Sequence, residues 1–384
     1  MAWGVWNRKP TDAVTATVGL DLNSSRARAV SGPPWGAAPR VLPLADVHAD
    51  LPLQVSLEHR TPVVGWPGYH LVRQAPHLIC RDYLPSLGER GASRVTESAL
   101  TATIAALKRE LPPGHAAGLA IPAYFGDMQA RQLIDALVHV GANIAGSVAA
   151  PLALAATESA AFGTALVLDA DEHALSWSVL AAEGPQARLL AHHCVRAASV
   201  RAWFDRLIDA VADRCIRLCR RDPRDSAAAE QGIFEQLDTA LSALLTNPQV
   251  ILNIRTAHWY QELKLTADEF ESFCAPLAQL GVESMRQVAT EAHSVAPVMA
   301  RPDLLWVTAD AARLPGLVAA ATQHVPESTT VQILAPDGLA IAAHTLAGHW
   351  LRGDLPRGHT GPVVLRLGMK SERHDAGRSR SQRI

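Results

Sequence analysis

The chain has 384 residues, of which 48% are hydrophobic and 19% are charged, and its formal net charge is −2. This length allows more than one hydrophobic core, since single cores stop growing at about 250–300 residues, and the near-neutral charge argues against nucleic acid or an anionic membrane as the main partner. No apolar run has the roughly 20 residues of a membrane helix, the N-terminus lacks a signal-peptide pattern, and five scattered cysteines favour a reducing cytoplasm.

In the N-terminal half, short strands alternate with helices. We expect a flexible tail over 1–16, a hairpin over 17–32 and a small irregular subdomain over about 33–94, which is rich in Pro and Gly. One helix is predicted from an N-cap at Thr96 to about Glu110, and a second from an N-cap at Asp127 to a C′ residue at Gly141. Apolar segments predict two buried strands and a short helix, at 116–124, 142–148 and 150–159.

A second hairpin is predicted in the stretch TALVLDADEHALSWSVL, residues 164–180, because its two halves alternate as strands do. Its turn is unusual. A tight turn commonly contains Gly or Asn, but here the sequence is Ala170-Asp171-Glu172-His173. The sequence therefore predicts a buried strand that ends at Asp169 and continues into a turn with two more acids and no glycine.

Helices dominate the rest of the chain. Ser199 is predicted to cap a long helix, and Thr266 with Glu269 forms a capping box for a later one. The first of these helices has an apolar stripe made of Trp203, Phe204, Leu207, Ile208, Val211, Cys215 and Leu218. Further predicted elements are a helix over 226–245, a strand pair at 249–254 and 258–265, a late strand at 303–310, a late helix at 338–350 and a disordered charged tail from Lys370.

Strands, then helices, then strands occur twice along the chain, which predicts an α/β protein of two lobes. Several stretches, in this order, resemble the ATPase domain of the heat shock protein 70 chaperones. LAIPAYFGDMQARQLIDALVHVGANIAGSVAAPLALA resembles that family's second core segment, and VGLDLNSSRA resembles its first phosphate hairpin. LVLDADEHAL occupies the place of the second phosphate hairpin, LLWVTADAARLP that of the adenosine loop, and APDGLAIAAH resembles the helix that follows.

The resemblance implies an actin-like ATPase fold, in which two lobes, each built on a mixed sheet with flanking helices, enclose a central nucleotide cleft. It places lobe I at 17–160 and lobe II at 161–335, with a helical subdomain at about 215–300. A helix over 336–352 would return to lobe I. Residues 353–384 would form a linker-like segment, GPVVLRLGM, and a charged tail. This segment either docks on the base of the second lobe or forms a final edge strand.

Seven residues lie at positions of the family's nucleotide site, although Asn23 replaces a glycine of the family there. Asp21 and Asp169 match two aspartates that hold Mg²⁺ through its waters, and Asn23, Ser24 and Ser25 lie in the first phosphate hairpin. Glu235 and Ser242 match positions on the helix that clamps adenine. The residues alone leave a second interpretation of Asp21 and Asp169 open, in which each ends a strand or caps a turn.

Other positions depart from the family. The three glycines of the second phosphate hairpin are replaced by Ala170, Asp171 and Glu172, which removes close backbone donors and adds two negative charges. From the residues, a solvated turn at 171–173 is favoured over a new metal site. The remaining departures are Ala150 for a cleft glutamate, Cys80 or Arg81 for the catalytic lysine, Arg196 for a threonine, Ala309-Asp310 for a Gly-Gly pair, and Asp238 and Thr239 for a basic pair.

Taken with these losses, the resemblance predicts a degenerate ATPase that binds ATP or ADP with Mg²⁺ weakly and hydrolyses it little or not at all. Such a protein would act as a regulatory or interaction module, with a co-chaperone or a client as its partner. One alternative is an active chaperone-type ATPase, which Asp21, Asp169, Ser24 and Ser25 favour. Another is a small-molecule kinase of the same superfamily, which the lost glycines disfavour.

Overall fold

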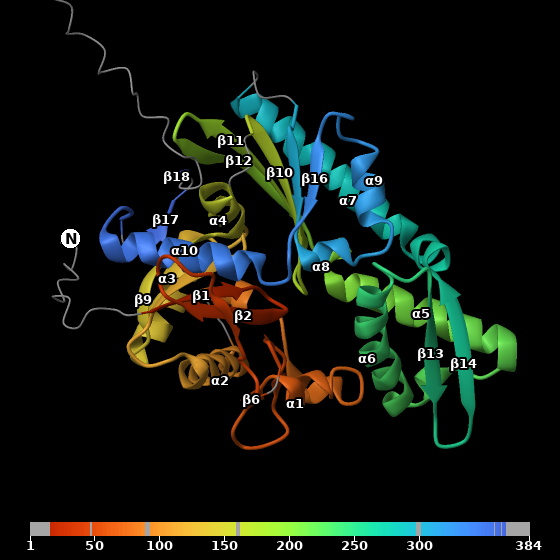
Figure 1. The fold of residues 1–384 in the computed structure, drawn as a ribbon. Helices are drawn as coiled ribbons and strands as arrows, with labels where there is room; N and C mark the ends of the chain where they lie inside the picture. The colour runs from red at the N-terminus through yellow and green to blue at the C-terminus, as the bar shows by residue number, and fades with distance from the viewer. Residues whose placement is uncertain are drawn as a thin grey trace, which may run out of the picture.

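The computed structural model describes residues 16–46, 48–88, 93–158, 162–296, 301–356, 358–361 and 363–365. It has a mixed α/β architecture with two large sheets (Figure 1).

The first sheet has the strand order β17-β9-β8-β1-β2-β3, and β4 also pairs with β2. β1, β2 and β3 are antiparallel neighbours, whereas β8 and β9 continue the sheet in parallel on the other side of β1. The strands are β1 (Thr17–Leu22), β2 (Arg26–Gly32), β3 (Arg40–Leu42), β4 (Asp50–Pro52), β8 (Ala116–Ile121), β9 (Asn143–Ala149) and β17 (Gly358–Thr360).

The second sheet has the strand order β16-β15-β10-β11-β12-β18. β10, β11 and β12 are antiparallel, and β15 and β16 continue in parallel beyond β10. Without β4 and the strands added by the chain end, both sheets therefore have the same arrangement of three antiparallel and two parallel strands. The bounds are β10 (Thr164–Ala170), β11 (Leu175–Glu183), β12 (Gln186–Val195), β15 (Leu304–Val307), β16 (Thr330–Ile333) and β18 (Val363–Leu365).

Two helices lie between the sheets (Figure 1). α10 (Gly338–Arg352) packs on β1 and β8 of the first sheet, and α4 (Ala150–Thr157) packs on β11 and β12 of the second. Together they form a core that includes Leu152, Trp306 and Trp350. Each sheet is thus joined to the other through apolar contacts as well as through the chain.

The outer faces are covered by the other helices. α2 (Arg94–Glu110) and α3 (Asp127–His139) share a core with β1 and β8. The second sheet packs on α5 (Val200–Cys219), α7 (Ala267–Val295), α8 (Ala309–Ala312) and α9 (Leu317–Thr322). Beyond them stand α6 (Ala227–Ala243) and the two-stranded sheet of β13 (Gln249–Arg255) and β14 (Tyr260–Thr266) (Figure 1). The segment between β4 and α2 contains β5 (Val55–Ser56), β6 (Val63–Val64), α1 (Trp66–Tyr69) and β7 (Ile79–Cys80).

Several local predictions are confirmed. Ser199 accepts a hydrogen bond from the Ala202 N–H as N-cap of α5, Thr266 and Glu269 form the capping box of α7, and Gly141 follows α3 with a φ of +80°. Three details were wrong. α2 is capped by Ser93 rather than Thr96, Gly126 rather than Asp127 is the N-cap of α3, and Leu218 on α5 is 57% exposed.

Glycines allow α10 to lie directly on the first sheet. A Cβ at Gly19 would lie 1.9 Å from the Ala340 carbonyl oxygen, and one at Gly118 would lie 2.4 Å from that of Ala343. Because both obstacles are backbone atoms, the helix itself would have to move. The close approach of strand and helix therefore requires glycine at these positions.

Replacing Gly19 with alanine is expected to lower the free energy of unfolding by about 2–3 kcal/mol, because α10 must shift within a packed core. Gly232, inside α6, is the matched control, since a Cβ there has no neighbouring atom within 4 Å and alanine favours helix over glycine. Urea unfolding of both variants checks this. Equal stability of Gly19→Ala and the parent protein would contradict the packing described.

The chain end adds one strand to each sheet. β17 pairs in parallel with β9, and β18 pairs antiparallel with β12. Residues 363–365 of the linker-like segment thus form an edge strand, one of its two predicted states, and its residues 362 and 366–369 lie outside the described residues. The predicted flexible tail over 1–16, apart from residue 16, and the predicted charged tail from Lys370 lie outside the described residues.

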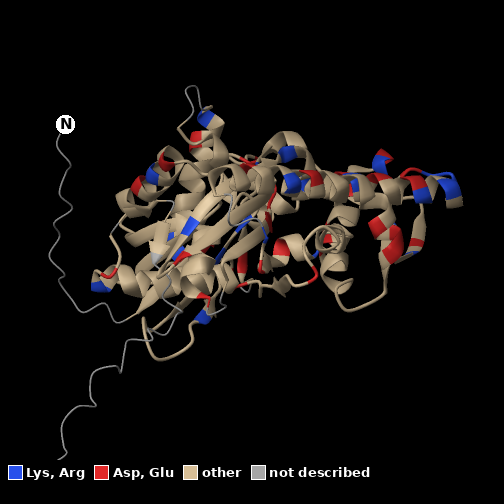
Figure 2. Ribbon diagram, turned by 90° about the horizontal axis from the view of Figure 1, so that it is seen from above, with Lys and Arg blue, Asp and Glu red and all other residues tan. Residues whose placement is uncertain are grey.

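In the described part of the chain, no helix is both long and apolar enough to cross a membrane. Basic and acidic residues lie among one another along the elements (Figure 2), in line with the near-neutral net charge and the many ion pairs.

Candidate functional site

The first predicted phosphate hairpin is closed by an asparagine side chain. Asn23 Oδ1 accepts hydrogen bonds from the N–H groups of Ser25 (2.9 Å) and Arg26 (3.0 Å), and the Asn23 N–H donates to the Arg26 carbonyl at 3.1 Å. This is an Asx turn, in which the side chain replaces a backbone acceptor. The turn therefore needs no glycine, and two of its amides are bonded within the turn.

The second hairpin repeats this design. Asp171 Oδ1 accepts from the N–H groups of His173 (2.9 Å) and Ala174 (3.0 Å), and the Asp171 N–H donates to the Ala174 carbonyl at 3.0 Å. None of these residues has a positive φ. The carboxylate of Asp171 thus explains why this turn closes without glycine.

The two hairpins meet directly. Asp171 Oδ2 accepts a 3.0 Å hydrogen bond from the Ser24 N–H, and Ser25 Oγ accepts a 2.8 Å bond from the Glu172 N–H. Tyr124 also donates its hydroxyl hydrogen to Asp171 Oδ2 and lies 2.9 Å from Ser24 Oγ. The amides of the two turns are therefore already hydrogen-bonded within the protein, those of Asn23 and Asp171 to backbone carbonyls and the others to side chains.

Asp171 lies at the centre of these contacts. It is 2% exposed and accepts from three backbone N–H groups and one hydroxyl, contributed by Ser24, Tyr124, His173 and Ala174. Burial raises the pKa of Asp171, while the bonds from Tyr124 and the three amides lower it. Several amides converging on one anionic group is the usual environment of a bound phosphate, and here a carboxylate of the chain fills it.

Residues 171–173 were predicted to form a solvated turn, and this was wrong. Glu172 is 9% exposed and accepts from Gln54 Nε2 at 2.8 Å. His173 is 6% exposed and lies between Asp82, 2.9 Å from Nδ1, and Arg196, whose Nε donates to Nε2 at 3.2 Å. Contacts with the opposite hairpin and with the segment before α2 bury the turn.

Asp21 and Asp169 line one small cavity of about 10 Å³ beneath the hairpins. Burial raises the pKa of Asp21 to about 8, opposed by Arg28 and increased by the charge of Asp169. Burial likewise raises the pKa of Asp169 to about 7, with a further rise from Asp171, although Thr308 Oγ1 donates to its carboxylate at 2.8 Å.

These residues do not fit a hydrated Mg²⁺. Mg²⁺ in proteins usually keeps several waters, whereas a cavity of this size holds about one. Among the described residues, no group of three or more His, Cys, Asp or Glu side chains could hold a metal ion.

Ion pairs connect the two halves of the site. Arg26 contacts Asp50 at 2.8 Å and Asp310 at 2.9 Å, and Arg28 contacts the same two carboxylates at 2.8 Å and 3.5 Å. Asp310 precedes Arg313, which pairs with Asp238 of α6. The pairs with Asp310 link the β1–β2 hairpin to the short helix α8, and Asp310 is only 6% exposed.

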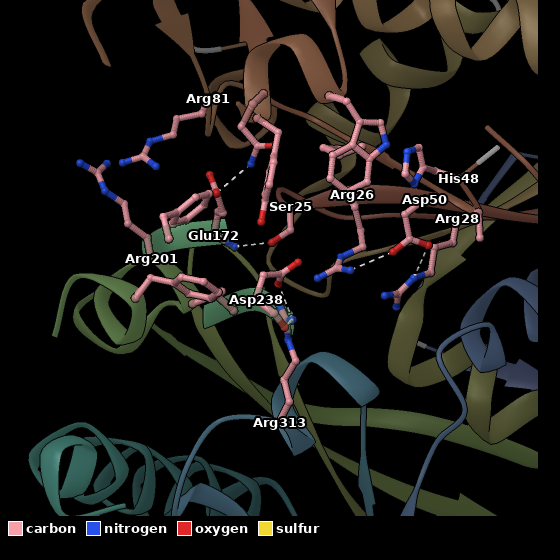
Figure 3. Close-up of a pocket in the computed structure, with 18 of the residues that line it drawn as sticks. Ser25, Arg26, Arg28, His48, Asp50, Arg81, Glu172, Arg201, Asp238 and Arg313 are labelled. Atoms are coloured by element: carbon pink, nitrogen blue, oxygen red, sulfur yellow. Dashed lines mark hydrogen bonds and ion pairs between the residues drawn. The ribbon is translucent and has the colours of Figure 1, made fainter. Parts of the chain in front are cut away.

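A larger pocket of about 320 Å³ lies beside the hairpins, with Ser25 and Glu172 in its wall (Figure 3). α6 contributes Phe234 and Asp238 to it; the predicted adenine-site residues Glu235 and Ser242 are not among its lining residues. Glu235 Oε1 instead lies 2.7 Å from His70 Nδ1, and the Ser242 hydroxyl donates to a carbonyl of its own helix.

Sequence reasoning placed Asp21, Asn23, Ser24, Ser25 and Asp169 in one region, and the structure brings all five together around the hairpins. The residues that the sequence did not indicate include Arg26, Arg28, Tyr124 and Gln54, as well as Asp50 and Asp82. Arg26 and Arg28 alternate on β2 with the buried Ala27, a spacing that could have indicated one shared polar face. Tyr124 lies in the quoted PAYF motif, whereas Gln54 had no sequence signal.

Comparison with models of known protein families found no match, and a search of curated proteins likewise found none.

Proposed function

We propose that this chain is a nucleotide-binding-domain module like that of heat shock protein 70 that has lost ATP hydrolysis and acts through regulation or protein interaction. Its fold would be the actin-like one, with two lobes around a cleft. The repeated strand arrangement of the two sheets supports this, as do two hairpins that meet between them. A co-chaperone or a client protein would be its partner.

One observation supports the proposed loss of ATP hydrolysis. The carboxylate of Asp171 lies where the amides of both hairpins converge, and the amides of Ser24, Ser25 and Glu172 are bonded to protein side chains. A triphosphate would have to displace this carboxylate and then face Glu172 at close range. Both steps oppose binding, because buried charged hydrogen bonds are costly to break and like charges repel.

The alternative of an active ATPase is favoured by Asp21 and Asp169, which still line one cavity. An assay of phosphate release from Mg-ATP separates the two proposals. Under the proposed function, the protein and its Asp169→Asn variant release phosphate at the same rate as a blank without protein. Turnover that requires Mg²⁺ and disappears in Asp169→Asn would support the active enzyme instead.

A further inference from the structure

The larger pocket beside the hairpins has features that the loss of ATP hydrolysis does not explain. Its walls come from the β1–β2 hairpin, the segment around α1, and the helices α5 and α6 (Figure 3). Trp66, Tyr69, Phe204 and Phe234 make part of the lining aromatic. At about 320 Å³, it lies at the lower end of the roughly 300–1,000 Å³ typical of small-molecule sites.

Six arginines line this pocket, and four of them are neutralised. Arg26 and Arg28 pair with Asp50 and Asp310, Arg73 pairs with Asp205 and Glu230, and Arg313 pairs with Asp238. The other two are Arg81 and Arg201, which lie near Glu172.

Arg81 and Arg201 are poorly compensated. Arg81 makes no hydrogen bond or ion pair with the described residues, and Arg201 reaches only Asp205, at 3.9 Å, which Arg73 already binds. Figure 3 shows both guanidinium groups directed to the same side of the pocket. Burial lowers the pKa of Arg81, as do the charges of Arg201 and Arg73, while Glu172 opposes them. Two like charges held together in this way favour an anion between them.

Buried polar atoms in the pocket wall are also without partners among the described residues. Gln54 Oε1 and Glu172 Oε2 are acceptors, on side chains that are 3% and 9% exposed, and Trp66 Nε1 and Arg73 Nε are donors. All four belong to pocket-lining residues. Buried polar groups are normally hydrogen-bonded, so a ligand here should carry both donors and acceptors.

We propose that this pocket binds a small organic anion, a carboxylate or a phosphate ester, that also carries hydroxyl groups. Its anionic group lies between Arg81 and Arg201, and its hydroxyl groups face Gln54 and Glu172. The pocket shares Ser25 and Glu172 with the hairpin contact, so the proposal rests on the proposed function, in which no triphosphate occupies this space.

Calorimetric titrations at low salt with four matched probes test it, namely glucose 6-phosphate, gluconate, glucose and inorganic phosphate. We expect saturable binding of glucose 6-phosphate or gluconate, with neutral glucose and bare phosphate at least about 10-fold weaker. The first two probes distinguish a phosphate ester from a carboxylate. If neither glucose 6-phosphate nor gluconate binds at concentrations up to about 10 mM, which corresponds to a binding free energy of only a few kcal/mol, the proposal is overturned.

Variants locate the binding. Arg81→Gln and Arg201→Gln should each weaken it by about 10-fold or more, because each removes a charge-assisted contact. Arg217→Gln, an exposed arginine at the other end of α5, should leave it unchanged. Arg201 is itself 52% exposed, so its variant keeps the test valid if Arg81→Gln fails to fold. Equal binding by the parent protein and Arg201→Gln would overturn the proposal.

Discussion

Replacing Asp171 with alanine is expected to lower the free energy of unfolding by about 4 kcal/mol, the range found when one partner of a buried charged contact is removed. The variant leaves the N–H groups of Ser24, His173 and Ala174 and the Tyr124 hydroxyl without their acceptor. It also removes the side chain that closes the β10–β11 turn. Chemical denaturation monitored by tryptophan fluorescence measures the loss.

Formate provides a sharper form of this experiment. If the donors around Asp171 form an anion site, about 100 mM formate should partly restore the melting temperature of Asp171→Ala and leave the parent protein unchanged, relative to an equal concentration of chloride. Asp135→Ala, an exposed position on α3, is the control and should change stability by less than about 0.5 kcal/mol. A small loss for Asp171→Ala, with no response to formate, would contradict the described role of Asp171.

Replacing Asp21 with asparagine is expected to stabilise the protein, and increasingly so as the pH rises. The pKa of Asp21 is raised from 3.8 to about 8, so the folded state resists ionisation of a group that ionises freely when unfolded. The Asp21 carboxylate makes no hydrogen bond with the described residues, so the asparagine variant loses no such bond. The gain should be close to zero at pH 3.5, about half of its maximum near pH 6, and roughly 5 kcal/mol above pH 8.

The direction of this effect follows from the raised pKa. Below pH 3.8 the carboxyl is neutral in both states, whereas stability is lost progressively as the pH rises from about 4 to 8. Unfolding curves of the parent protein and Asp21→Asn between pH 3.5 and 9, with EDTA present, measure the difference. A difference that does not vary with pH would mean that Asp21 ionises as freely in the folded protein as in the unfolded chain.

Local patterns predicted much of the secondary structure. The alternating apolar residues of 164–180 indicated a hairpin, and Ser199, Thr266 and Gly141 marked helix ends, because each of these signals depends only on nearby residues. The repeated order of strands and helices indicated two lobes. The structure has two large sheets, and each contains three antiparallel strands followed by two parallel ones.

Contacts between distant residues were not predictable in the same way. The Ser24–Asp171 bond joins residues 147 positions apart, and the Gln54–Glu172 bond joins residues 118 apart. When only neighbouring residues are considered, a glycine-free turn with two acids and a histidine is expected to be exposed to solvent. Their burial depends on the opposite hairpin, and nothing in their own sequence specifies that partner.

The most direct test of the proposed function is a calorimetric titration of the protein with Mg-ATP. A phosphate contact from an amide is worth roughly 1.5–3 kcal/mol as a charge-assisted bond. Losing two or three of them and adding the negative charges of Asp171 and Glu172 removes on the order of 5 kcal/mol, which weakens binding by more than about a thousandfold. That loss reduces a submicromolar affinity to the millimolar range. We therefore predict no saturable heat of binding at ATP concentrations up to about 1 mM. A micromolar dissociation constant that is abolished by Asp21→Asn would contradict the account, because it would mean that ATP displaces Asp171 from between the hairpins and binds with the help of Asp21.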